Sequence, residues 1–359
     1  MGRDDLNNGG TVSQPFALPA TIRTEKELEE IVSRPTPDLV ESMAALSGDL
    51  LILGVGGKLG PDLAHLALRA IQEAGVSKRV IGVSRFSAPT VRKKLEAWGA
   101  ETIAADLLRS DELEKLPDAE NVIFLIGRKF GTGGAESQTW AWNTFLPGLV
   151  ARRFRASRIV ALSSGNVYPF VPIVSGGADE SVQPDPVGEY GQSVLGRERL
   201  FEFFSRRYGT PGVLIRLNYS NSLTYGVLVD IGQKILAGQA IDLAASAANF
   251  IWQGDTNRYI LRSFEIAASP PTVLNLTGPE TVSIRWAARE LARRLDKEPR
   301  FVNQETETAL LNNAAFCFEN FGYPVVPLKK ILDWVADWLL RGGITLDRPT
   351  HFEEREGKF

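Results

Sequence analysis

Short apolar runs alternate with longer amphipathic segments through the first 216 residues of the chain. The segments between the runs place apolar residues every three to four positions, which is typical of helices. Runs that are short and continuously apolar indicate strands buried on both faces, and such strands form parallel sheets. The expected strands are 50–53, 80–83, 102–104, 122–126, 158–162 and 213–216, and the expected helices between them are 61–74, 90–98, 140–153 and 190–208.

This alternation predicts an α/β fold in which residues 49–215 form a Rossmann-type, doubly wound parallel sheet. Beyond residue 216 the pattern changes to mixed short elements, including a strand at 273–276 and helices at 283–295 and 328–340. Residues 216–342 are therefore expected to form mostly a smaller C-terminal α/β substrate lobe, interleaved with the last elements of the Rossmann domain.

The segments that flank these two parts differ in pattern. Residues 1–22 are rich in Gly, Asn, Asp, Thr and Pro without apolar periodicity, which predicts a disordered arm. Residues 23–48 predict an N-terminal helical extension, because Thr24 and Glu27 have the spacing of a capping box and Pro35 and Pro37 precede a second helix. Residues 343–359 predict a polar tail.

Composition narrows the function classes. The chain has 359 residues, of which 44% are hydrophobic, and its 40 basic and 43 acidic residues are spread along it, so no footprint for nucleic acid or an anionic membrane appears. No apolar run approaches the roughly 18 residues of a membrane span, and there is no signal core. One cysteine, Cys317, and two separated histidines argue against a disulfide framework or a metal site. We expect a cytoplasmic, metal-free protein with a small-molecule substrate.

The first expected strand leads directly into a glycine-rich turn. Gly54, Gly57 and Gly60 have G-x-x-G-x-x-G spacing, and Lys58 and Leu59 complete the turn before Pro61 opens the helix. In a dinucleotide-binding unit the glycines permit a tight turn, close approach of the backbone to a pyrophosphate, and close packing of helix on strand. The helix N-terminus adds N–H donors and a positive dipole end. The sequence therefore predicts a dinucleotide site here.

The end of the second strand indicates which dinucleotide is preferred. An acidic side chain at this place would hold the ribose 2′-hydroxyl of NAD, but the sequence has Ser84 and Arg85. Ser84 does not repel a 2′-phosphate, and Arg85 can pair with one through its guanidinium group. We therefore expect NADP to be preferred over NAD, although an arginine here could also stack on adenine or face solvent.

Further motifs follow the glycine turn in a specific order. They are Asp106-Leu107 after the third strand, Asn143 in the central helix, Ser163-Ser164-Gly165-Asn166-Val167-Tyr168 after the fifth strand and Tyr190-Gly191-Gln192-Ser193 at the start of a helix, 26 residues beyond Ser164. With these motifs, residues 49–340 resemble the extended short-chain dehydrogenase/reductase superfamily, in particular its NAD(P)-dependent epimerase/dehydratase family, which acts on nucleotide sugars. Segments 216–219 and 275–280 resemble the family's substrate-lobe segments.

The resemblance implies an NAD(P)-dependent oxidoreductase or epimerase acting on a hydroxyl or keto group of a sugar or sugar derivative, and a homodimer. Tyr190 would carry the proton and Ser164 would polarise the substrate oxygen. The remaining implied site residues are Asn143 as a third catalytic residue, Asp106 and Leu107 at the adenine, and Arg128, Asn166, Arg216 and Asn218 as candidate substrate contacts. Gly165 and Asn166 stand where a sugar dehydratase of the family has acidic residues, which disfavours dehydration.

One departure from the family's pattern concerns the proton carrier. The fourth residue after the tyrosine is a lysine in the family, where it holds the nicotinamide ribose and lowers the tyrosine pKa, and here it is Val194. Among the loop cations after the fourth strand, we favour Lys129 over Arg128 as a replacement, although both could equally be solvated. The alternative hypothesis is a non-catalytic NAD(P)(H)-binding sensor that kept the fold and lost the chemistry.

Overall fold

The structure, a computed structural model, describes residues 17–131 and 133–358. Most of the predicted disordered arm, residues 1–16, lies outside the described residues. Thr132 and the last residue of the predicted polar tail, Phe359, also lie outside them. Seven parallel strands form one sheet in the order β12-β7-β5-β4-β1-β2-β3. The strands are β1 Leu50–Leu53, β2 Val80–Ser84, β3 Glu101–Ala104, β4 Asn121–Phe124, β5 Arg158–Ser164, β7 Gly212–Leu217 and β12 Thr272–Leu276. The prediction of an α/β fold with a doubly wound parallel sheet is confirmed.

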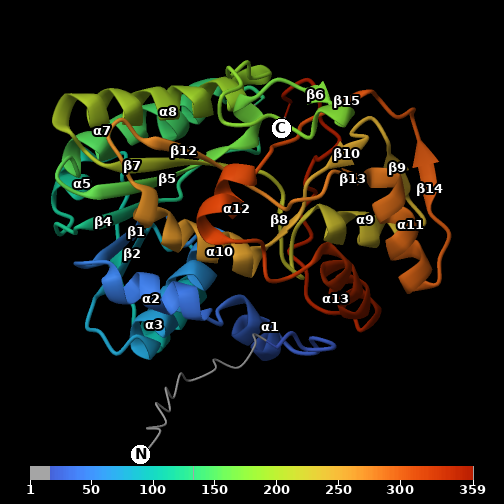
Figure 1. The fold of residues 1–359 in the computed structure, drawn as a ribbon, viewed down its shortest axis with the longest axis horizontal. Helices are drawn as coiled ribbons and strands as arrows, with labels where there is room; N and C mark the ends of the chain where they lie inside the picture. Colours follow the sequence, from blue (N-terminus) through green and yellow to red (C-terminus); the bar gives the residue numbers. More distant parts are fainter. Residues whose placement is uncertain (1–16, 132, 359) are drawn as a thin grey trace, which may run out of the picture.

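Helices cover both faces of the sheet (Figure 1). One face carries α2 Pro37–Ala45, α3 Gly60–Glu73, α4 Pro89–Trp98 and α10 Gln253–Arg262, and the other carries α5 Ser110–Glu114, α7 Leu146–Arg153 and α8 Gly188–Tyr208. Burial on both faces explains why the strands read as continuous apolar runs. In β1, Leu50 and Ile52 join the core on the α3 side, whereas Leu51 and Leu53 join the core on the α8 side.

The central helix of the Rossmann domain contains an irregular turn. It begins as α6 Glu136–Trp140, continues as a π-helical turn over Ala141–Phe145 and then becomes α7. The sequence pattern predicted one regular helix over 140–153. The π-helical turn widens the helix by one residue where it passes the loop after β4, and it places Asn143 with its side chain fully buried.

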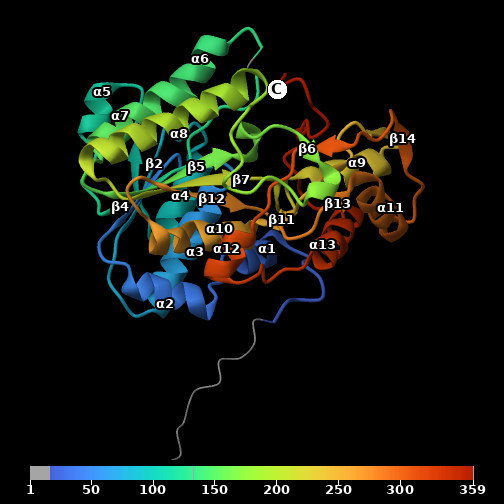
Figure 2. The same cartoon turned by 45° about the horizontal axis from the view of Figure 1, so that its top comes forward.

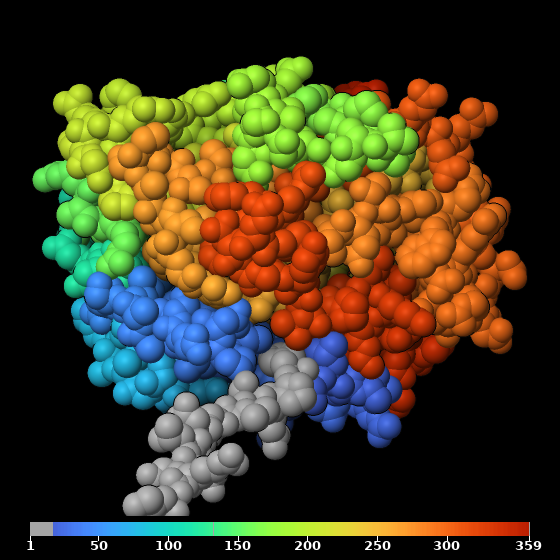
Figure 3. Space-filling view, in the orientation of Figure 1, coloured from blue at the N-terminus to red at the C-terminus, as the bar shows by residue number. Residues whose placement is uncertain are grey.

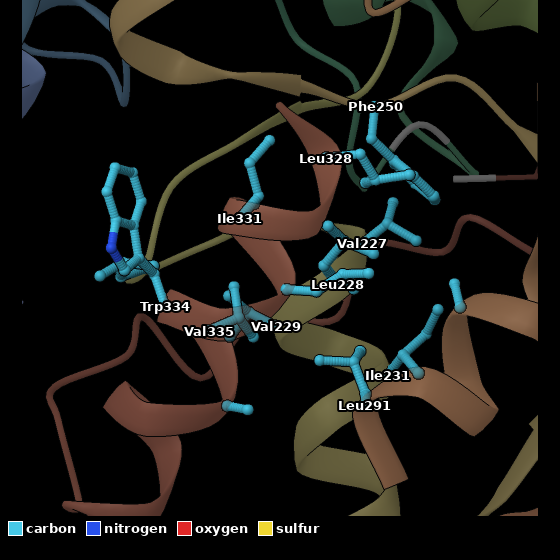
Figure 4. Packing of buried hydrophobic residues seen from close by; sticks show 14 of the residues in the cluster. Val227, Leu228, Val229, Ile231, Phe250, Leu291, Leu328, Ile331, Trp334 and Val335 are labelled. Atoms are coloured by element: carbon cyan, nitrogen blue, oxygen red, sulfur yellow. The ribbon is translucent and has the colours of Figure 1, made fainter. Parts of the chain in front are cut away.

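The C-terminal lobe packs around its own hydrophobic core. Its helices are α9 Val227–Leu236, α11 Ile284–Leu295 and α13 Leu328–Leu340, whereas α12 Ala315–Phe321 packs against β12 and α10 in the core on the α3 side of the sheet. The short strands of the lobe are β8 Ser220–Asn221, β9 Ala240–Asp242, β10 Ala247–Ala248, β11 Ile251–Trp252, β13 Val282–Ser283, β14 Arg300–Val302 and β15 Thr308–Ala309, with β6 Val171–Pro172 paired to β15. Figure 4 shows Val227, Ile231, Leu291, Leu328 and Val335 meeting between α9, α11 and α13.

The two parts of the chain are interleaved. The strand expected in the lobe at 273–276 lies as β12 at the edge of the main sheet, paired with β7. The N-terminal helix α1 Glu25–Val32 buries Leu28 and Ile31 in the lobe core, whereas α2 packs on α3. In the space-filling view of Figure 3, the orange-red surface of α12 lies between the Rossmann half on the left and the lobe on the right. These contacts hold the lobe beside the carboxyl edge of the sheet.

Residues 343–358 return from α13 toward the Rossmann domain without forming a helix or strand. The end of the chain lies beside β6 in both views (Figures 1 and 2). A Cβ added at Gly188, the first residue of α8, would lie 2.7 Å from Cα of Gly357, so the segment touches the start of that helix. We call residues 343–358 the strap.

In the described part of the chain, no helix combines the length and apolar character that crossing a membrane requires.

Candidate active site

The glycine turn lies where the strand order of the sheet reverses, between β1 and the pair β2 and β4 that flank it. In open α/β sheets, ligands bind in the crevice outside the carboxyl ends of the strands at this point. Gly54 has φ +89°, and a Cβ at Gly60 would lie 2.2 Å from the Val55 carbonyl oxygen. Only glycine fits either position, because one needs the left-handed region and the other packs α3 directly on the turn. Leu59 precedes the first turn of α3.

A cleft of about 490 Å³ extends from the glycine turn across the edge of the sheet. Its volume lies within the range of small-molecule and cofactor sites. Seven of the predicted site residues line it: Gly54, Gly57, Ser84, Arg85, Leu107, Arg128 and Lys129. Trp142, Phe130 and Ser87 also line it, and they are not among the predicted site residues.

Among the residues that the structure describes, no carboxylate lines this cleft at its predicted ribose edge. The guanidinium carbon of Arg85 lies 5.0 Å from the centroid of the Trp142 ring, so the two side chains stack. The Asp106 carboxylate accepts a hydrogen bond from the Leu108 N–H at 3.2 Å and does not line the cleft. Arg85 is therefore the charged side chain that can meet an anion here.

The predicted proton-transfer pair lies at the carboxyl end of β5 and the first turn of α8. The Ser164 hydroxyl donates to Asn166 Oδ1 at 3.0 Å and accepts from the Asn166 N–H at 3.2 Å. Burial raises the pKa of Tyr190, while a hydrogen bond with Ser164 and the charge of Arg197 act in the opposite direction. Two residues far apart in sequence thus share one hydrogen bond in the site.

Asn143 fixes the loop after β4. Its Oδ1 accepts from the Arg128 N–H at 2.8 Å, and its Nδ2 donates to the Arg128 carbonyl oxygen at 2.9 Å and to Ser193 Oγ at 3.0 Å. The side chain therefore ties the loop to α8, next to Tyr190. This role is positional, since the amide is occupied by the protein's own groups.

Val194 occupies a small apolar cluster instead of the cleft. It is fully buried and packs with Val167, Tyr168 and Ala178 beneath the turn that follows β5. A valine here contributes packing, and the electrostatic support for Tyr190 has to come from other side chains.

Lys129 is one source of that support. Its ammonium lies 5.7 Å from the centroid of the Tyr190 ring. Burial and repulsion from Lys58 lower the pKa of Lys129 to about 8. Lys58 itself lies in the glycine turn, with its ammonium 3.2 Å from the centroid of the Tyr225 ring, and desolvation and repulsion from Arg348 lower its pKa to about 8. Two ammonium groups whose charging is made costly by burial and by neighbouring cations form a site suited to an anion.

Arg197 is a second source that sequence reasoning missed. It lies on α8 seven residues after Tyr190, on the same face of the helix, and is buried. Its Nη1 donates to the Leu162 carbonyl oxygen at 2.6 Å and its Nη2 to Asn143 Oδ1 at 3.1 Å. Burial lowers the pKa of Arg197 to about 10, and Tyr190 opposes this. The sequence signal was a basic residue in helical phase with the tyrosine.

Arg216 and Asn218, predicted as substrate contacts, serve other purposes in the structure. The Arg216 guanidinium forms a buried ion pair with Glu198 at 2.7 Å and donates to the Tyr168 hydroxyl at 2.7 Å. Asn218 Nδ2 donates to the Leu310 carbonyl oxygen at 3.1 Å. Neither side chain lines the cleft. Arg128 lines it, and its guanidinium donates to Gln138 Oε1 at 2.6 Å and to the Gly131 carbonyl oxygen at 2.9 Å.

A second, smaller cavity adjoins the cleft on the side of the lobe. It is lined by Lys129 and Asn166 from the Rossmann domain, by Phe170, Tyr219, Ala245, Ala247 and Leu310, and by His351, Phe352, Glu354 and Arg355 of the strap. Lys129 lines both spaces, so this cavity lies on the substrate side of the site.

Comparison with known proteins agrees with this fold. Among solved structures, UDP-glucuronic acid 4-epimerase from Bacillus cereus in complex with NAD matches with a TM-score of 0.67 and 18% identity, covering 82% of this chain and 99% of the other. UDP-glucose 4-epimerase from Thermotoga maritima with UDP-glucose matches with a TM-score of 0.66 and 17% identity, covering 82% and 99%. A putative epimerase from Burkholderia cenocepacia matches with a TM-score of 0.66 and 21% identity, covering 82% and 98%.

A search of curated protein sequences found no significant match. The model of the NAD dependent epimerase/dehydratase family matches residues 50–226, which span the glycine turn, Ser164 and Tyr190. This segment of the chain therefore belongs to the NAD dependent epimerase/dehydratase family.

Proposed function

We propose that the protein is an NAD(P)-dependent enzyme that oxidises and reduces a hydroxyl-bearing carbon of a nucleotide sugar, as in epimerisation. The observation that carries the proposal is the Ser164–Tyr190 hydrogen bond beside the cleft that begins at the glycine turn. The structural neighbours include epimerases with UDP-sugars and NAD, which supports this substrate class.

The residues present fit a bound dinucleotide. The glycine turn leaves the backbone free to approach a pyrophosphate, and the positive end of α3 and the ammonium of Lys58 favour its charge. A bound nicotinamide would accept the hydride from the substrate carbon and return it. Lys129, at the far side of the same cleft, adds a second cation.

Tyr190 would take the proton of the substrate hydroxyl and give it back. Since burial raises its pKa, the phenolate needs positive charge nearby at working pH. Lys129, above the ring, and Arg197, on the same face of α8, would supply that charge in place of the lysine that the family has at position 194. Ser164 would polarise the substrate oxygen, and Asn143 would hold the loop that carries Lys129.

Turnover tests the proposal. Purified protein is supplied with UDP-glucose or UDP-glucuronic acid and NAD⁺ or NADP⁺, and products are separated by chromatography. We expect Tyr190→Phe to lower kcat by roughly a hundredfold or more, because general acid–base catalysis contributes that much. Undiminished turnover in Tyr190→Phe would remove this residue from the mechanism.

The second candidate function is a non-catalytic NAD(P)(H)-binding sensor. The observation that favours it is the burial of Val194 in an apolar cluster, which leaves the cleft without the family's lysine. Tight binding of reduced cofactor without turnover of any sugar nucleotide would support the sensor, whereas conversion of a UDP-sugar would exclude it.

We further propose a homodimer, as the family resemblance implies. Phe145 of the π-helical turn and Phe203 of α8 are 58% and 53% exposed on the outer side of the Rossmann domain, which is unusual for large apolar side chains. Multi-angle light scattering of Phe203→Glu against the unmodified protein checks this. The cytoplasmic location stays a prediction from composition.

A further inference from the structure

The strap closes the substrate side of the active site. After α13 it passes the turn that precedes α9, where the Leu346 N–H donates to the Thr224 carbonyl oxygen at 2.9 Å. It then passes the loop after β4, where the rings of His351 and Phe130 lie 5.8 Å apart. At Gly357 it reaches the start of α8, where it contacts Gly188. Gly188 lies two residues before Tyr190 in that helix. The strap thus spans the lobe and the Rossmann domain.

The space behind the strap is too small for a sugar. The cavity between the strap, Lys129 and Asn166 has a volume of about 10 Å³, which is room for about one water molecule. Sites for small-molecule ligands measure on the order of 300 Å³ or more. The neighbouring cofactor cleft already has that size, at about 490 Å³. Access is therefore limited on the substrate side alone.

Three residues of the strap contribute its main contacts near the cavity, beside an ion pair of Glu353 with Lys234 at 3.4 Å. The Thr350 N–H and hydroxyl both donate to Asp230 Oδ2, at 2.9 and 2.6 Å. Phe352 is 3% exposed and packs in the lobe core. Arg355 donates to the carbonyl oxygen of Thr308 at 2.8 Å and to its hydroxyl at 2.7 Å. We call Thr350, Phe352 and Arg355 the latch.

Release of the latch would leave the rest of the fold in place. The strap belongs to no sheet and no helix, so its contacts are side-chain packing and a few hydrogen bonds. Segments of this kind open locally at a small fraction of the free energy of global unfolding. Removing the strap from the cavity would also take four of its lining residues away: His351, Phe352, Glu354 and Arg355.

We propose that the strap is a gate over the substrate pocket, held closed by the latch, and that a sugar-sized substrate enters only when the gate opens. The substrate class rests on the proposed function above, whereas the opening of the gate does not.

A thiol placed behind the gate measures its opening without any substrate. Ala247 lines the cavity and is 5% exposed, so Ala247→Cys gives a side chain that Ellman's reagent reaches only when the strap is released. Cys317 is fully buried in the core on the α3 side and reports global unfolding in the same experiment. We expect Thr350→Val and Phe352→Ala each to speed labelling of the introduced cysteine by roughly tenfold, with Cys317 still unreactive.

Phe154→Ala is the matched control for Phe352→Ala. Phe154 is 2% exposed and packs on the α8 side of the sheet, away from the strap, so its loss should leave labelling unchanged. Equal labelling rates with and without the latch substitutions would overturn the gate. A rise that appears equally at Cys317 would also overturn it, because it would show unfolding of the whole protein.

A kinetic measurement then separates the gate from the proposed function. With UDP-glucose, Thr350→Val is expected to lower KM several-fold and to retain kcat, because the closed state no longer competes with binding. An increase in KM would show that the strap is a fixed wall that binds the substrate, which contradicts the gate. Latch-dependent labelling in a protein that turns over no UDP-sugar would leave the gate standing and count against the proposed function.

Discussion

The ammonium of Lys129 lies 5.7 Å from the centroid of the Tyr190 ring. The lysine that the family pattern places four residues after this tyrosine is Val194 here. This relationship gives a prediction with a defined pH dependence. A cation stabilises the phenolate and lowers the pKa of Tyr190, so Lys129→Met should raise that pKa and move the pH profile of kcat/KM upward. We expect kcat/KM at pH 7 to fall roughly tenfold, which corresponds to a shift of about one pKa unit.

The pKa of Lys129 itself sets where this effect disappears. Because that pKa is about 8, the lysine charge is present below pH 8 and is lost as pH rises through it. The unmodified protein and Lys129→Met should therefore converge above pH 8, whereas Lys129→Arg should keep its advantage there. Lys115→Met is the control, because Lys115 is an exposed lysine directly after α5. A pH profile unchanged by Lys129→Met would contradict the assignment.

Arg197 should affect both stability and pH dependence. Arg197→Met removes the Arg197 donor to the Leu162 carbonyl oxygen and one of the two donors to Asn143 Oδ1, which keeps the Arg128 N–H. We expect this loss to cost about 1–3 kcal/mol of unfolding free energy. Arg197→Lys keeps the charge but loses the planar donor group, so it should recover most of the pH profile and only part of the stability. Urea denaturation and rate–pH curves measure the two effects. Identical pH profiles for the two variants would show that Arg197 is structural alone.

The glycine turn offers a stringent pair of substitutions. Gly60→Ala would place a methyl group 2.2 Å from the Val55 carbonyl oxygen, so the turn has to move and dinucleotide affinity should fall by roughly a hundredfold or more. A Cβ at Gly133, in the loop after β4, meets no atom within 4 Å, so Gly133→Ala should bind normally. Isothermal titration with NADPH distinguishes them. Equal affinities would place the dinucleotide elsewhere.

Arg85 should decide between the two nicotinamide cofactors. If its guanidinium meets a 2′-phosphate, Arg85→Ala should weaken NADPH binding by roughly tenfold to a hundredfold and leave NADH binding nearly unchanged. If Arg85 with Trp142 forms a surface for adenine, both cofactors should lose affinity equally. Fluorescence titration of both reduced cofactors measures the ratio, and an unchanged ratio would argue against a preference for NADP.

The buried pair of Arg216 and Glu198 predicts a stability effect without a binding effect. Glu198→Gln leaves the guanidinium without its charged partner, and we expect a loss of about 3–5 kcal/mol in unfolding free energy. Ser163 Oγ also donates to Glu198 Oε1, at 2.5 Å, so the network spans β5, β7 and α8. Chemical denaturation should show the loss while KM of the remaining folded protein is retained. A raised KM would return Arg216 to the substrate site.

Local patterns were sufficient to predict six strands of the sheet, the longer helices between them and the glycine turn, but not the position of β12 at the sheet edge. Apolar runs and glycine spacing are encoded within a few residues, and the turn from Gly54 to Gly60 needs no distant contact to be recognised. The destinations of Arg216 and Arg197 depend on pairing between elements that are far apart in sequence. The sequence around Arg216 does not show that its guanidinium pairs with Glu198 of α8.

The strap illustrates the same limit. Its sequence is polar, and a single aromatic residue, Phe352, carries the core contact that holds it on the lobe. Periodicity cannot detect a segment that forms no helix or strand, because its partners are set by tertiary structure. The site at the glycine turn was therefore predicted from sequence, whereas the strap over the neighbouring cavity was not.

The π-helical turn at Ala141–Phe145 sets the rotational phase of everything before it in the central helix. An α-helix advances about 100° per residue, so deleting a single residue here would turn α6 and its preceding loop by that angle relative to α7. The Asn143 amide would then face away from Arg128, and Trp142 would leave Arg85. One extra residue in this helix thus aligns both ends of the cleft, at Arg85 and at the loop that carries Lys129.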